Sequence, residues 1–125
     1  MAVWSFYDFV EVSGRVPIQE WYAGLGEDVQ AVIDDRILKM SGLETWPPKW
    51  ASKLTGYDEL VEMRITFQKV QYRPLGMYAP GRKFILLDGA IEKNDRLPVG
   101  TIEAADRRSH LLKKEPHHVR RHRFD

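Results

Sequence analysis

Residues 60–91, which read LVEMRITFQKVQYRPLGMYAPGRKFILLDGAI, contain three successive strand candidates. The candidates are Leu60–Phe67, Val70–Tyr78 and Lys83–Ile91, and each is rich in β-branched, aromatic or aliphatic residues. Only Gln68-Lys69 and the turn at residues 79–82 separate them, and connections this short force neighbouring strands to run antiparallel. The stretch therefore predicts an antiparallel three-stranded meander.

Helices are predicted on both sides of this meander. Upstream, a strand candidate at residues 3–10 precedes a short helix that begins at Pro17 and a longer helix over residues 27–41 with apolar side chains at helical spacing. Downstream, Pro98 begins a last helix over Val99–Lys114, and Glu115-Pro116 ends it. We therefore expect an α+β fold in the order β-α-α-β-β-β-α, with an N-terminal helical hairpin, the meander sheet and a C-terminal helix.

The charge of the chain is unevenly distributed. The 125 residues carry a net charge of +1, but Arg107–Asp125 contain seven basic and two acidic residues, which gives +5, and the rest of the chain carries −4. We expect one domain over residues 1–114, followed by a basic C-terminal tail at residues 115–125. Deleting this tail is expected to leave the fold intact and to weaken anion binding in a salt-dependent way.

Composition and motifs exclude several classes of protein. The chain has no cysteine, which excludes disulfides and thiolate chemistry. It has no apolar run long enough to cross a bilayer and no basic n-region before residue 10, so we expect a cytoplasmic protein without a membrane partner. His118 and His122 have metal-ligand spacing, but Arg120, Arg121 and Arg123 surround them, and we expect no metal and no cofactor.

Cationic residues on the meander and beside it are the best candidates for chemistry. Converging on one surface, they would hold a phosphodiester and oppose the charge that builds on it during cleavage. The alternative is that Arg64 pairs with Glu62 or another acid and is an ordinary surface charge. The cationic residues are Lys53, Arg64, Arg73, Lys93 and Arg96.

Several segments resemble motifs of one protein family. Residues 53–64 (KLTGYDELVEMR), 70–75 (VQYRPL) and 86–93 (LLDGAIEK) are similar to the K-x-L-x-G…L-x-E-x-R, Y-R-x-L and L-L-h-x-F-x-K-K signatures of the RelE/HigB toxins. The likeness is greatest to their phage-derived, HigB-like branch. Residues 103–107 and the opening Val16-Pro17…Trp21 extend the resemblance, which covers roughly residues 15 to 110 in the correct order.

The resemblance implies a RelE-like toxin of a type II toxin-antitoxin system. Such a toxin enters the ribosomal A site and cuts mRNA without a metal, and a helix-turn-helix type of cognate antitoxin controls it. The resemblance places Arg64, Arg73 and Lys93 in the catalytic site. Arg64 and Arg73 would stabilise phosphate through their fixed charge, and Lys93 would hold phosphate or supply a proton. The oligomeric state stays open.

Further nucleic-acid contacts are expected outside these three residues. Tyr72 and Tyr78 are candidates for base stacking, and the alternative for each is a place in the core. Cations of the tail are candidates for binding RNA. The expected nucleic-acid-binding residues are Lys53, Tyr72, Arg96, Arg120 and Arg121.

Two departures from the family pattern keep other functions open. Ala90 and Glu92 stand where the family has an aromatic residue and a lysine, which favours a non-catalytic, phage-derived nucleic-acid-binding or regulatory protein. A ParE-like protein that binds DNA gyrase and cuts nothing would share the fold. The nuclease assignment requires that the guanidinium groups of Arg64 and Arg73 face one hollow and are not held in buried ion pairs.

Overall fold

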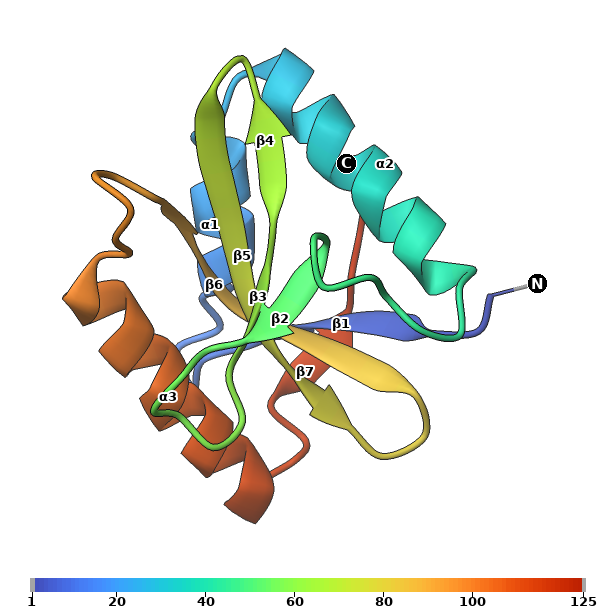
Figure 1. Cartoon of the computed structure of the whole chain (residues 1–125). Coiled ribbons are helices and arrows are strands. Elements are labelled where there is room, and N and C mark those ends of the chain that lie inside the picture. Colours follow the sequence, from blue (N-terminus) through green and yellow to red (C-terminus); the bar gives the residue numbers. More distant parts are fainter. Residues whose placement is uncertain (1, 125) are drawn as a thin grey trace.

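A computed structural model of the chain describes residues 2–124, over which a seven-stranded mixed sheet packs between helices (Figure 1). The strands follow the order β2-β3-β5-β6-β1-β7, and β4 pairs with β5 beside this path. The elements are β1 (Ser5–Phe9), α1 (Pro17–Ala23), α2 (Glu27–Ser41), β2 (Ala51–Lys53), β3 (Val61–Met63), β4 (Ile65–Phe67), β5 (Val70–Ala79), β6 (Lys83–Ile91), α3 (Val99–Lys114) and β7 (Val119–Arg121).

The α+β class and the antiparallel meander are confirmed, but the predicted order of elements is incomplete. Strands β4, β5 and β6 form the meander, with Thr66 opposite Gln71 and Arg73 opposite Ala90. Strand β1 adds to β6 in parallel, so the sheet is mixed. The sequence missed β2 and β7, and the predicted strand Leu60–Phe67 is divided into β3 and β4.

The division between β3 and β4 falls at Arg64, whose backbone bonds to other elements. The N–H of Arg64 donates to the carbonyl of Trp50 at 2.8 Å, and its own carbonyl accepts a 2.7 Å bond from the guanidinium of Arg36 on α2. That guanidinium also lies 4.5 Å from the centre of the Trp50 ring. Arg64 is therefore fixed at a break in the strand by one contact from α2 and one from Trp50, just before β2.

Each face of the sheet carries its own hydrophobic core. On one face α1 and α2 pack, and α2 buries Val29, Ile33, Ile37 and Met40 along one stripe. On the other face α3 packs through its own buried side chains, chiefly Leu112, against strand residues of the second core. Full burial of an aliphatic side chain contributes about 1.5–3 kcal/mol. No helix within residues 2–124 is both long and apolar enough to cross a bilayer.

Part of the expected basic tail, Val119–Arg121, forms strand β7 of the sheet. Strand β7 runs antiparallel to β1, with Val119 opposite Phe9. Asp8 on β1 is completely buried, and its carboxylate pairs with Arg120 at 3.3 Å and with His122 at 2.6 Å. A buried carboxylate needs such partners. The charge of Arg120 therefore stabilises the fold by pairing with Asp8.

Candidate nucleic-acid interface

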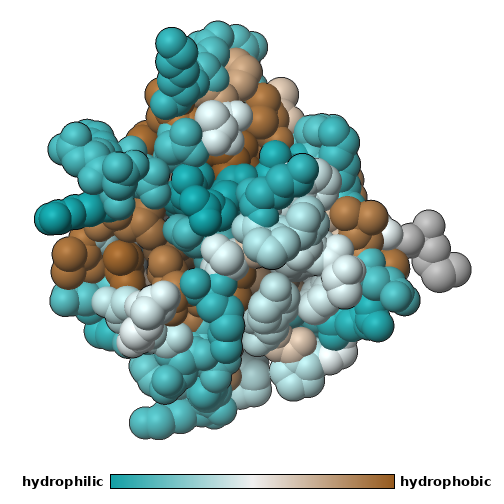
Figure 2. All heavy atoms as spheres, viewed as in Figure 1, coloured by the Kyte–Doolittle hydropathy of each residue, from teal (hydrophilic) through white to brown (hydrophobic). Residues whose placement is uncertain are grey.

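An open hollow on the sheet contains two of the cations that the sequence singled out. It has a volume of about 460 Å³ and lies beside β4 and β5, and we call it the Arg64 hollow. Figure 2 shows hydrophilic residues gathered over the middle of β5 on this face. The residues that line the hollow are Pro48, Lys49, Arg64, Thr66, Gln71 and Arg73.

Arg64 presents its guanidinium to solvent within this hollow. Its side chain is 45% exposed, and its nearest acidic partner is Glu62, with Nη1 and Oε1 3.9 Å apart. An exposed pair at this separation contributes little to stability, about 0–1 kcal/mol. The Arg64 cation therefore stays available to a phosphate, as the nuclease assignment requires.

Arg73 is different, because its guanidinium is buried and paired. The side chain is 3% exposed and lies 3.8 Å from Glu62 and 3.6 Å from Glu92. It also donates to the Gln71 side chain at 3.0 Å and to the Tyr72 carbonyl at 3.3 Å. Arg73 is thus not the free guanidinium that the expected stabilisation of phosphate by Arg73 needs. Ala90 lies opposite Arg73 in the sheet, and Glu92 supplies one of its two acidic partners.

Glu62 is the functional candidate that the sequence analysis did not select. Its carboxylate lies within 4 Å of both guanidinium groups, yet neither of its oxygens accepts a hydrogen bond from the residues that the structure describes. Burial raises the pKa of Glu62, and the charges of Arg73 and Arg64 oppose this rise. The L-x-E-x-R spacing, which places residues 62 and 64 on one face of a strand, is the signal that could have found it.

An unpaired donor also faces this carboxylate. The Nε atom of Arg73 is buried without a hydrogen-bond partner, and it is the atom that lies 3.8 Å from Glu62. Buried polar groups are normally satisfied, so an incomplete network of this kind is typical of a site with a function. Two arginines of the Arg64 hollow are thus paired with two acids, Glu62 and Glu92, that lie beside its lining.

The other predicted cations lie outside the lining of the Arg64 hollow. Lys93 and Arg96 are exposed at the ends of a tight turn, where their backbones exchange two hydrogen bonds of 2.9 Å. Asn94 and Asp95 form the turn with φ angles of 51° and 60°. Lys53 is exposed at the end of β2. The structure brings Arg64 and Arg73 together and leaves these three cations apart from them.

The comparison with known families gives one match. The family described as phage-derived protein Gp49-like (DUF891) matches residues 20–110, which is most of the chain. The chain belongs to this family. The family is known as a RelE/HigB-like toxin type, so the resemblance holds in this coarse form. No curated protein sequence matches the chain.

The match omits both terminal strands of this Gp49-like protein. Strand β1 precedes the matched residues and β7 follows them, and the two strands pair with each other. They meet through the Asp8 carboxylate and its partners Arg120 and His122. The two ends of the chain thus close one edge of the sheet together.

The aromatic and tail candidates occupy different environments in this Gp49-like protein. Tyr72 is only 9% exposed and belongs to the core under α1 and α2, so its ring cannot stack on a base. Tyr78 is 42% exposed and packs 5.5 Å from the ring of Trp4. Arg121 is exposed, and its guanidinium lies 5.3 Å from the centre of the Tyr7 ring. Tyr78 and Arg121 thus remain accessible.

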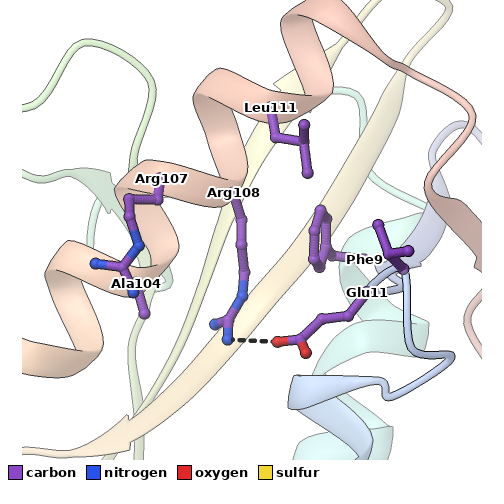
Figure 3. Close-up of a pocket in the computed structure, with 7 residues that line it drawn as sticks. Phe9, Glu11, Ala104, Arg107, Arg108 and Leu111 are labelled. Carbon is purple, nitrogen blue, oxygen red and sulfur yellow. Dashed lines mark hydrogen bonds and ion pairs between the residues drawn. The ribbon is translucent and has the colours of Figure 1, made fainter.

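A second pocket of about 250 Å³ lies between α3 and the end of β1 (Figure 3). Figure 3 shows Arg108 pointing toward Glu11, at 3.0 Å, while Arg107 points away from it. Arg108 also binds Asp88 on β6 at 2.9 Å. Its charge is therefore neutralised by two acids, and it holds α3 against the sheet.

Proposed function

We propose that this Gp49-like protein is the toxin of a type II toxin-antitoxin system, acting in the cytoplasm by cutting mRNA on the ribosome. Its family, which is of the RelE/HigB-like toxin type, supports the toxin assignment. The carboxylate of Glu62, without a hydrogen bond from residues 2–124 and within 4 Å of two guanidinium groups, is the observation that carries the chemistry. A helix-turn-helix type of antitoxin, encoded nearby, is the expected partner.

The reaction needs a base, and Glu62 has the properties of one. In metal-independent cleavage the RNA 2′-OH attacks the adjacent phosphate and the bond between phosphorus and the 5′ oxygen breaks. A group must therefore accept the hydroxyl proton, and the leaving 5′ oxygen takes a proton from solvent. Burial moves the pKa of Glu62 toward neutral pH. A general base works best when its pKa lies near the pH at which it acts. Such a base typically accelerates a reaction by about 10²–10⁴-fold.

The two arginines have separate tasks in this scheme. Arg64, at the exposed rim, contacts the phosphate and opposes its growing negative charge. Lys49 lines the same hollow and adds a second cation. Arg73 lies beneath them and is a positioning residue, because its buried guanidinium lies within 4 Å of both Glu62 and Glu92 and keeps the two carboxylates in place.

This scheme replaces the site of three exposed cations. That site required free guanidinium groups at both Arg64 and Arg73, and only Arg64 meets the condition. Neither Lys93 nor Glu62 lines the Arg64 hollow, but the Glu62 carboxylate lies within 4 Å of both arginines that do. The nuclease proposal therefore depends on Glu62 with Arg64 and no longer on Arg64, Arg73 and Lys93 as a group.

A non-cleaving nucleic-acid-binding or regulatory protein is the second candidate. The two acids beside the hollow favour it, because Glu62 and Glu92 offset the charge of the two arginines and lower the affinity for phosphate. Binding to DNA gyrase without cleavage is a third outcome, which the same experiment separates from the other two.

Induction of the chain in bacterial cells distinguishes these functions. Primer extension on a reporter message, incorporation of labelled amino acids and the count of double-strand DNA breaks are measured together. The nuclease proposal predicts arrested translation and cut mRNA with wild-type protein, and neither with Glu62→Gln or Arg64→Ala. The matched control Arg107→Ala removes an exposed arginine on α3 and keeps both effects. DNA breaks with intact mRNA would identify a gyrase inhibitor, and harmless induction with retained RNA binding would identify the regulatory protein.

A further inference from the structure

The turn between α3 and β7 gathers three side chains that are common metal ligands. Glu115, His117 and His118 each offer one ligand atom, and these atoms lie within 4.8 Å of one another. The two imidazole rings lie 4.3 Å apart between centroids, with 33° between their planes. We propose that this turn binds one divalent transition-metal ion, and specifically Zn²⁺, which accepts two imidazoles and a carboxylate.

The spacing of the ligand atoms suits such an ion. Zn–N and Zn–O bonds of about 2.0–2.2 Å place two ligands of a tetrahedral ion about 3.4 Å apart. The Oε1 atom of Glu115 and the Nε2 atom of His118 are already 3.7 Å apart. His117 is exposed and the Glu115 side chain is 51% exposed, so both can rotate the short remaining distance without disturbing the core.

His118 is the anchored member of the site. Its side chain is 15% exposed, and its ring lies 6.5 Å from the ring of Phe9. Its carbonyl accepts a 2.9 Å hydrogen bond from the N–H of Val10. One ligand is thus held by the fold, and the two exposed ligands close on the ion from the turn.

Two of the three arginines on which the electrostatic objection rested are held by other groups in the structure. Arg120 turns to Asp8, and the guanidinium of Arg121 lies over the Tyr7 ring. Lys113, at the end of α3, pairs with Glu59. These cations are therefore held by other groups. His122 takes no part, because its Nδ1 atom lies 2.6 Å from Asp8.

Metal binding at this turn would join α3 to the edge strand β7. The turn leads directly into β7, and the hydrogen bond from Val10 to His118 connects it with the end of β1. An ion held there would slow the opening of this edge of the sheet. Hydrogen exchange at the Val10 amide therefore reports the ion independently of any activity.

Titration of the full chain with ZnCl₂ by calorimetry tests the proposal, together with hydrogen exchange at Val10. One Zn²⁺ per chain is expected, with slower exchange at Val10, and His117→Ala lowers the affinity by about tenfold or more. His110→Ala is the matched control, because it removes an exposed histidine of α3 that pairs with Asp106 instead. Equal affinity in His117→Ala and wild type, no 1:1 binding, or unchanged exchange at Val10 would each overturn the site and leave an adventitious ion only.

Discussion

The Nδ1 atom of His122 lies 2.6 Å from the Oδ1 atom of Asp8, a residue with no exposed surface. The two residues are 114 positions apart, and their contact fastens β7 to β1. The end of the chain is therefore a structural element. This changes what its removal is expected to do.

Deletion of residues 115–125 should destabilise the protein strongly. It removes both partners of Asp8 together with the strand that pairs with β1, and breaking a buried ion pair costs about 3–5 kcal/mol. Urea denaturation followed by circular dichroism measures the loss. Arg123→Ala, which removes an exposed cation of the same segment, should change the midpoint little. A truncated chain as stable as the full one would show that Asp8 does not need β7.

The substitution Arg73→Ala should act mainly by lowering the stability of the fold, because Arg73 is buried and does not contact the phosphate in this scheme. The substitution removes the buried cation that Glu62 and Glu92 share. The loss should lower the free energy of unfolding by about 2–4 kcal/mol, because both acids are partly buried. Arg64→Ala, at the exposed rim, should cost less than about 1 kcal/mol. Equal urea midpoints for the two variants would contradict the assignment of Arg73 as a buried positioning residue.

The titration of Glu62 should depend on Arg64. The pKa of Glu62 is raised, so this group stabilises the folded state below its ordinary value of 4.5, and that stability is lost as pH rises through the folded pKa. The rate of cleavage should increase as pH rises through this pKa, because the ionised carboxylate is the base. Arg64→Ala removes a charge that lowers this pKa and should raise it further. Carbon NMR of the Glu62 carboxyl measures the shift, and an unchanged or lower pKa would show that the two groups are not coupled.

Gly76 should tolerate no larger side chain. A Cβ atom there would lie 2.4 Å from the ring of Phe84 and 2.7 Å from the carbonyl of Ile85. Gly76→Ala should therefore cost about 1–3 kcal/mol of unfolding free energy. Gly100→Ala is the control, because open space surrounds this position at the start of α3 and alanine favours a helix. Thermal unfolding should separate the two variants, and equal melting temperatures would contradict the packing at Gly76.

Local signals predicted most of the fold. Pro17 and Gly24 bounded α1, helical spacing over residues 27–41 gave α2, and Pro98 marked the start of α3. The strands β5 and β6 followed from their turns and composition. The short strands β2 and β7 have three residues each, too few for a periodic pattern.

The features that the sequence missed depend on distant partners. The break at Arg64 requires the Trp50 carbonyl and Arg36 of α2, and neither contact has a local signal. The candidate site also depends on contacts between distant residues, which local sequence signals do not reveal. Sequence placed Arg64 and Arg73 near one another, but only the register of β5 with β6 brings Glu92 to Arg73 and shows that this arginine is neutralised.

The most direct test of the central claim is the rate of mRNA cleavage by purified protein on programmed ribosomes, compared between wild type and Glu62→Gln. If Glu62 is the base, Glu62→Gln should lower the rate by about 10²-fold or more while the protein stays folded and bound to ribosomes. A Glu62→Gln protein that cuts at the wild-type rate would contradict the account.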